Sequence, residues 1–260
     1  MNSGLDGPRL DDGMWTGLLE RRATDPGAVA AAYAARRQRA RLLGDDGMLF
    51  LVAADHPARG MVGVGNDPLA MADRRDLLQR LLMALDCPEV DGVLGTPDIV
   101  EELLLLPSSE GGSALDGKVV IGSMNRGELA ARQLMAMLEP LPYARDDSGQ
   151  LRMLRDTYSN VRAVSVAAGL GATSAWTWLK LPALAEPEAV LGASTLPALV
   201  LGGEPASDPA QDRAAWQRTL ACPTARGLVV GRALLYPPDN DVRAAVDAAA
   251  QVLRPDRIVR

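Results

Sequence analysis

The chain has 260 residues, of which 48% are apolar and 23% are charged. This composition is typical of a folded globular protein and excludes disorder along the whole chain. The net charge of −6 argues against nucleic-acid binding, because such proteins present a basic stripe to the phosphate backbone. No apolar run approaches the roughly 20 residues of a membrane span, and the polar, acidic start lacks the features of a signal peptide.

Cysteine and histidine are scarce in this sequence. Cys87 and Cys222 each precede a proline and have no neighbouring Cys or His, and His56 is the one histidine. We therefore expect two reduced, buried thiols in a cytoplasmic protein, and no metal site or cofactor. The basic residues are also unusual, since only two of the 27 are lysine, Lys118 and Lys180.

The chain opens with a helical pattern over 15–43, broken at 25–27 and ended by Gly44. Short Val/Leu/Ile runs then alternate with helical segments, as in a parallel sheet covered by helices on both faces. No GxGxxG follows the first run, so a nucleotide-binding doubly wound sheet is disfavoured. We predict an N-terminal helical extension, 1–47, and one α/β domain, 48–260, folded as a TIM-type (β/α) barrel. The predicted strands are 48–54, 90–96, 118–124, 134–139, 174–181, 196–202 and 227–234, and the predicted helices are 68–85, 97–106, 157–169, 186–193, 208–220 and 239–253.

One connection is too short for this pattern. Residues 125–133 separate two predicted strands, whereas a parallel crossover needs about a dozen residues with a complete helix. Asn125 and Glu128 resemble the capping pair of a short helix. Either 126–139 is a single helix, or one β/α unit is missing near 125–133 and the barrel has seven strands.

Reactive side chains follow several predicted strands at the edge where barrel enzymes hold their active sites. Lys180 lies within an apolar strand, and burial there favours a neutral amine that can attack a carbonyl. Glu139 and Asp55 are the candidate proton carriers for this reaction. Three other readings stay open: Lys180 as a strand-end lysine in water, Asp55 as a turn residue, and Glu139 as an exposed loop acid.

Glycine-rich turns follow the last two predicted strands. Gly202, Gly203 and Gly231 fit a phosphate site built from backbone amides, to which Arg232 adds a positive charge. Glycine pairs are also common in ordinary turns. His56 is either a general acid or a residue that closes its loop. Lys118 begins its strand at the opposite face and is expected to be a solvated turn residue.

These segments together resemble the class I (Schiff-base) aldolase superfamily of β/α barrels. The matching elements are AADHPARG (53–60), LEPL (138–141), WLKLP (178–182), LGG (201–203) and VGRALLYPP (230–238). Over about 15–253, GKVVIGSMNRG, AAGLGATSAWTWLKLP and RGLVVGRALLYPPDND resemble a bacterial branch found with myo-inositol catabolism. That branch implies cleavage of 2-deoxy-5-keto-gluconate 6-phosphate to dihydroxyacetone phosphate and malonate semialdehyde.

The resemblance implies a role for each matching residue. Lys180 would be the Schiff-base lysine, Asp55 the first-strand acid and Glu139 the fifth-strand acid/base. Phosphate would be held by Gly202, Gly203, Gly231 and Arg232, with His56 and Arg59 as further substrate contacts.

The chain departs from its relatives at the short connection, where they carry about one more β/α unit. The fourth-strand cation near the Schiff base is then absent, and two sheet edges are left unpaired. Three outcomes stay open: a smaller or distorted barrel, pairing with another chain as a homo-oligomer, or loss of activity. The alternative functions are therefore a barrel that only binds a phosphorylated sugar or a partner protein, and a dehydratase or isomerase that uses the two acids without the lysine.

Overall fold

The structure is a computed structural model that describes residues 8–25, 27–57, 61–122, 135–169, 174, 177–203 and 209–255. The chain divides into two compact units. The first unit comprises Met1–Ser123, Gly203–Pro205 and Val230–Arg260, and the second comprises Met124–Gly202 and Ala206–Val229. The predicted short connection, 125–133, lies outside the described residues.

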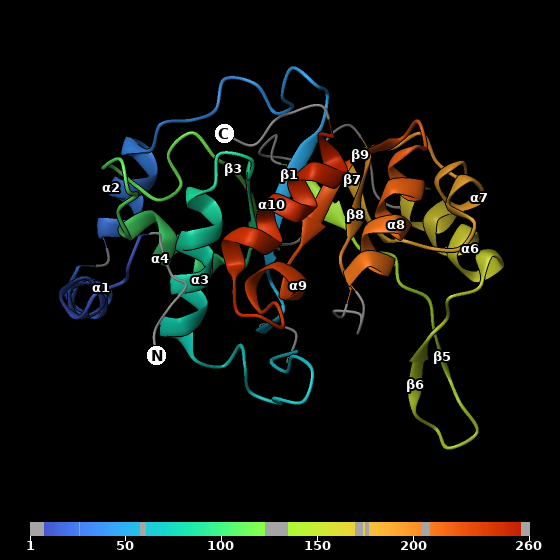
Figure 1. The fold of residues 1–260 in the computed structure, drawn as a ribbon, viewed down its shortest axis with the longest axis horizontal. Coiled ribbons are helices and arrows are strands. Elements are labelled where there is room, and N and C mark those ends of the chain that lie inside the picture. The colour runs from blue at the N-terminus through green and yellow to red at the C-terminus, as the bar shows by residue number, and fades with distance from the viewer. Residues whose placement is uncertain are drawn as a thin grey trace. The chain divides into compact units, whose positions relative to one another are not determined.

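Seven strands form one sheet within the described residues (Figure 1). They are β1 (Leu49–Ala54), β2 (Gly92–Gly95), β3 (Val119–Gly122), β4 (Ala136–Leu138), β7 (Thr177–Pro182), β8 (Ala198–Leu201) and β9 (Ala225–Val230). Their order is β3-β2-β1-β9-β8-β7-β4, and the neighbouring pairs within each unit are parallel. This is the parallel sheet of a TIM-type (β/α) barrel with seven strands, so the predicted fold class is confirmed.

The two ends of the strand order are β3 and β4. These are the strands that flank the short connection in the sequence. The alternative in which 126–139 forms a single helix is wrong, because 136–138 is a strand paired with β7. The short connection in the sequence therefore lies between the two strands that end the sheet order.

The first unit begins with two helices, α1 (Asp12–Thr24) and α2 (Gly27–Ala35). The Asp11 side chain caps α1 by accepting a hydrogen bond from the Met14 N–H. Four further helices follow the strands of this unit: α3 (Arg74–Asp86), α4 (Pro97–Leu105), α9 (Arg232–Leu235) and α10 (Val242–Leu253). Helix α3 buries a stripe of leucines, and β1 is buried at every residue. This unit therefore has its own apolar core.

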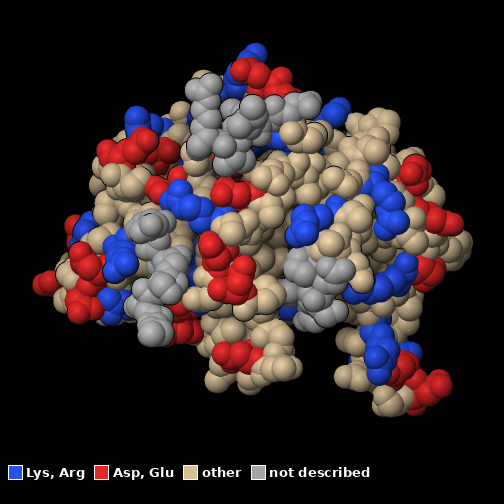
Figure 2. Space-filling view, viewed as in Figure 1, with Lys and Arg blue, Asp and Glu red and all other residues tan. Residues whose placement is uncertain are grey.

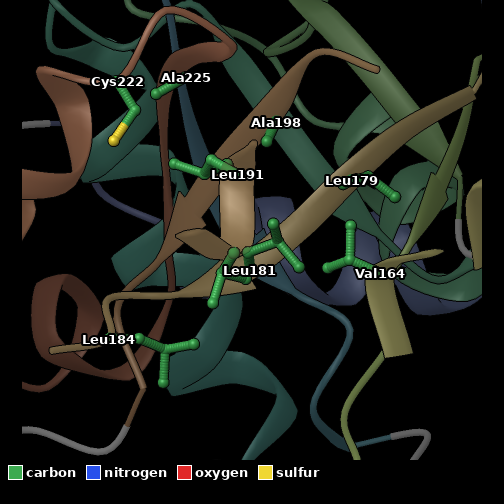
Figure 3. Close-up of a cluster of buried hydrophobic side chains, with 9 residues drawn as sticks. Val164, Leu179, Leu181, Leu184, Leu191, Ala198, Cys222 and Ala225 are labelled. Carbon is green, nitrogen blue, oxygen red and sulfur yellow. The ribbon is translucent and has the colours of Figure 1, made fainter. Parts of the chain in front are cut away.

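The second unit packs α6 (Thr157–Gly169), α7 (Pro187–Leu191) and α8 (Pro209–Leu220) with its strands. Its core cluster joins Leu179 and Leu181 of β7 to residues of the helices and of β8 and β9 (Figure 3). The other members are Val164, Leu184, Val190, Leu191, Ala198, Cys222 and Ala225. Since side chains alternate along a strand, Leu179 and Leu181 face this cluster and Lys180 faces the other side of the sheet.

Several predicted boundaries differ from the structure. Helix α3 begins at Arg74 rather than at 68, because the Asp73 carboxylate caps it through the Asp76 N–H, while Pro68 lies in a turn. A hairpin of β5 (Tyr143–Arg145) and β6 (Leu151–Met153), which projects from the second unit in Figure 1, was not predicted. The last predicted strand, 227–234, divides into β9 and the short helix α9.

The composition argued against a nucleic-acid-binding protein and against a membrane span, and the surface and the helices of the structure bear on both points. Basic and acidic side chains are interspersed on the face seen in Figure 2, rather than gathered in one basic stripe. Within the described part of the chain, every helix is too short or too polar to cross a membrane.

Candidate functional site

The register of β4 and β7 brings the predicted lysine and the predicted acid together. Met137 is opposite Trp178 and Leu138 is opposite Leu179, so Glu139 follows in line with Lys180. Paired residues of neighbouring strands point to the same face of a sheet. The Lys180 Nζ accordingly lies 3.5 Å from the Glu139 Oε2.

Lys180 is buried, with 4% of its side chain exposed, and the Glu139 side chain is 19% exposed. The reading of Lys180 as a strand-end lysine in water is therefore wrong. An amine and a carboxylate in this arrangement can act as a nucleophile and its proton carrier.

Asp55 and His56 lie directly after β1 in the first unit, and both are buried, at 5% and 7% exposure. The Asp55 Oδ1 is 3.7 Å from the His56 Nδ1. A buried carboxylate beside an imidazole can orient the ring and stabilise its protonated form.

The turn after β9 meets the turn after β1. A Cβ built on Gly231 would lie 2.5 Å from the Ala53 carbonyl oxygen and 2.5 Å from the His56 Cε1. Arg232 follows as the first residue of α9 and is 5% exposed. The first unit thus brings the His56 imidazole, with the Asp55 carboxylate next to it, against Gly231.

The remaining predicted site residues are the glycines after β8 and Arg59. Gly203 has a φ of +69°, a conformation that favours glycine, and Gly202 is partly exposed. Gly202 belongs to the second unit and Gly203 to the first. Arg59 lies outside the described residues.

Lys118 contradicts its prediction as a solvated turn residue. It is half-buried just before β3, and its Nζ donates hydrogen bonds to the carbonyl oxygens of Val90 at 2.7 Å and Cys87 at 3.4 Å. Burial lowers the pKa of its amine. The Lys118 amine therefore donates to backbone carbonyl oxygens, whereas the prediction placed it in water.

The sequence reasoning also missed a buried ion network beside Lys118. Asp91 accepts hydrogen bonds from Arg39 and Arg254, and these residues line a cavity of about 840 Å³ in the first unit. The sequence feature that marks this network is Asp91, directly before a buried strand. An aspartate in that position is equally typical of a turn.

Residues 47–131 and 127–250 match the sequence profile of the Cgl0159-like family. The chain belongs to this family. The crystal structure of Cgl0159 from Corynebacterium glutamicum is 38% identical to it, with a TM-score of 0.87 over 96% of this chain and 100% of the other. No curated protein matches this Cgl0159-like chain.

Archaeal fructose 1,6-bisphosphate aldolases are more distant structural neighbours. One is 17% identical, with a TM-score of 0.57 over 87% of this chain and 99% of the other. A second, whose catalytic Lys is covalently bound to the carbinolamine intermediate of the substrate, is 16% identical with a TM-score of 0.56 over 86% and 99%. At this identity the likeness shows a β/α barrel fold alone.

Proposed function

We propose that this protein is a class I aldolase that cleaves a phosphorylated keto-sugar acid through a Schiff base on Lys180. The observation that carries the proposal is the buried Lys180 amine, 3.5 Å from the Glu139 carboxylate. A buried amine beside a carboxylate, on a parallel strand of a β/α barrel, matches the chemical needs of iminium formation.

The reaction needs an amine, a proton carrier and an electron sink. The Lys180 Nζ attacks the substrate ketone, and Glu139 gives a proton to the departing hydroxyl as the carbinolamine loses water. The resulting iminium then accepts the electron pair of the breaking carbon–carbon bond. Asp55 assists the proton transfers, and the mechanism requires no metal or cofactor because the iminium is the electron sink.

The substrate is proposed from the family resemblance of the sequence. Its AAGLGATSAWTWLKLP and RGLVVGRALLYPPDND segments favour 2-deoxy-5-keto-gluconate 6-phosphate, with dihydroxyacetone phosphate and malonate semialdehyde as products. Gly202, Gly203, Gly231 and Arg232 are assigned to the phosphate, and His56 and Arg59 to other substrate contacts. We place this activity in the cytoplasm.

Borohydride trapping tests the proposal directly. Dihydroxyacetone phosphate is itself a ketone, so sodium borohydride should reduce its iminium to a stable adduct on Lys180. Because the chain has only two lysines, peptide mapping distinguishes Lys180 from Lys118 without ambiguity. An unchanged intact mass, with this ligand and with the keto-sugar acid, would end the proposal.

Three variants sharpen the experiment. Lys180→Met removes the amine and replaces it with an apolar side chain of similar length, so the adduct should disappear while the fold is kept. Glu139→Gln should slow trapping and turnover by about 10²–10⁴-fold, the usual contribution of a positioned proton carrier. Lys118→Arg is the matched control, because it removes the other lysine and should keep the adduct and turnover within a factor of a few.

The alternative is a barrel that binds a phosphorylated sugar or a partner protein without catalysis. It is favoured by the seven-strand sheet, whose order ends in the strands flanking the short connection. Under this alternative, no adduct forms while phosphorylated ligands still raise the melting temperature. A dehydratase or isomerase that uses the two acids would keep its activity in Lys180→Met, whereas the aldolase would not.

A further inference from the structure

The hairpin of β5 and β6 forms a sheet of its own, with no third strand among the described residues. It projects from the second unit (Figure 1), and each of its strands has three residues. Every residue of β5 is exposed, including Tyr143 at 55%, and Leu151 of β6 is 57% exposed. A two-stranded hairpin of this size is marginally stable in water, so a further strand at its edge would stabilise it.

The hydrogen bonds that flank the hairpin show which backbone groups face outward. The Leu154 N–H donates to the Pro142 carbonyl oxygen at 2.8 Å, and the Asp146 N–H donates to the Gln150 carbonyl oxygen at 2.9 Å. Residues that bond to the neighbouring strand alternate with residues that do not along an antiparallel pair. The even-numbered residues of 142–146 therefore bond within the hairpin, and the odd-numbered ones turn their N–H and C=O groups to the outer edge of β5.

Tyr143 and Arg145 are the two odd-numbered residues, and Ala144 lies between them. In the described part of the chain, the backbone N–H and C=O groups of Tyr143 and Arg145 have no hydrogen-bond partner. An exposed edge of this kind is a template for pairing with another strand. The outer edge of β5 is therefore a surface on which a strand of a partner can add.

A second copy of the same edge fits this surface when the two strands run antiparallel and centre on Ala144. Each Tyr143 then lies opposite Arg145 of the other copy, and the two residues exchange both of their free backbone hydrogen bonds. The guanidinium and the tyrosine ring lie on the same face, where a cation–π contact forms. The two Ala144 residues meet at the symmetry axis, and their small side chains leave room for this close approach.

The outer edge of β6 fits a second copy less well. Antiparallel pairing centred on Arg152 would place two guanidinium groups directly opposite one another, and like charges in that position are destabilising. The Asp146 carboxylate, 2.5 Å from the Arg152 guanidinium, offsets part of this repulsion. The β5 edge has no such repulsion to offset, because Ala144 stands at its centre.

We propose that two copies of this chain associate through their β5 edges, forming an antiparallel sheet of four strands in the order β6-β5-β5-β6. The occupant is a second copy because the edge is complementary to itself about Ala144, in its backbone groups and in the pairing of Tyr143 with Arg145. The contact is short, so we expect a weak dimer with a Kd of about 1–100 μM. This association does not depend on the proposed aldolase reaction.

Disulfide crosslinking tests the pairing and its register. Facing residues of an unbonded antiparallel pair have Cα atoms about 4.5 Å apart, within the range that a disulfide spans. Oxidation of Ala144→Cys by diamide should therefore give a covalent dimer on a non-reducing gel, since the natural cysteines, Cys87 and Cys222, are buried. Arg152→Cys is the matched control on the neighbouring strand and should stay monomeric. Failure of Ala144→Cys to crosslink, or equal crosslinking of Arg152→Cys, would overturn the proposal.

Sedimentation velocity over a range of protein concentrations tests the side-chain pairing. Tyr143→Lys places like charges opposite Arg145 in both symmetric pairs and should raise the dimer Kd about 10–100-fold. Tyr143→Glu places opposite charges there and should keep the dimer.

Tyr158→Lys is the matched control for these variants, because Tyr158 of α6 is 76% exposed and lies outside the β5 edge; its Kd should equal that of the wild type. A wild-type protein that stays monomeric at every concentration would overturn the proposal, and so would an unchanged Kd in Tyr143→Lys.

Discussion

Asp91 is the residue whose removal should cost this protein the most stability outside the proposed site. Its Oδ1 accepts a hydrogen bond from the Arg39 guanidinium at 2.7 Å. Its Oδ2 accepts from the Phe50 N–H at 2.7 Å and from the Arg254 guanidinium at 2.6 Å. Asp91 and Arg254 are both buried, so neither exchanges these partners for water.

The expected loss of stability follows from the groups that Asp91→Ala leaves without a partner. The Phe50 N–H loses its acceptor inside the core, and Arg254 keeps the Asp46 carboxylate at 2.6 Å and, from Glu89, the carbonyl oxygen at 2.8 Å and the carboxylate at 3.7 Å. Removing one partner of a buried ion pair costs about 3–5 kcal/mol. Because Arg254 retains these partners, we expect a loss of about 4 kcal/mol, equivalent to a melting temperature lower by about 12 °C in a chain of this size.

Denaturant and thermal unfolding of three variants measure this cost. Asp116→Ala is the control, because it removes an ion pair to an Arg37 side chain that is 71% exposed and one acceptor of the Arg37 N–H, and this should cost about 1 kcal/mol. Asp91→Asn should be intermediate, since its amide oxygen still accepts the Phe50 N–H. If Asp91→Ala is no less stable than Asp116→Ala, the network does not anchor the first unit and the reasoning is refuted.

Two further predictions concern the same unit. Gly92→Ala should lower the free energy of unfolding by about 3 kcal/mol or more, because the added Cβ would lie 1.9 Å from the Val119 carbonyl oxygen of the neighbouring strand; a melting temperature within 3 °C of wild type would contradict this. Burial raises the pKa of the Cys87 thiol to about 11, so its alkylation in the native protein should be slow at pH 8 and accelerate toward pH 11, and a rate independent of pH over this range would contradict the prediction.

The sheet could be predicted from the sequence because its strands are buried on both faces. Such strands are short continuous apolar runs, and each of the seven predicted runs contains a strand of the sheet or overlaps one. The hairpin of β5 and β6 was missed for the opposite reason. Its strands are three residues long, and all three residues of β5 are exposed, so no apolar periodicity marks them.

The residue types of the candidate site could be predicted from the sequence, but the contacts between them could not. The position of Lys180 within a predicted strand and of Glu139 at the end of another was visible in the sequence, whereas their proximity depends on the register of β4 against β7. The packing of Gly231 against His56 could not be predicted either, because a glycine after a strand is also typical of an ordinary turn. Long-range register and packing, rather than local propensity, decide both contacts.

The two lysines show why burial alone does not identify the reactive amine. Both are withdrawn from water, yet Lys118 donates hydrogen bonds to two backbone carbonyls, which can accept hydrogen bonds but cannot exchange a proton with the amine. Lys180 has a carboxylate 3.5 Å away, which can both receive and return a proton. An arginine, otherwise the standard cation of this chain, cannot become neutral at either place. Under the proposed function, the carboxylate beside Lys180 is what makes this difference chemically useful.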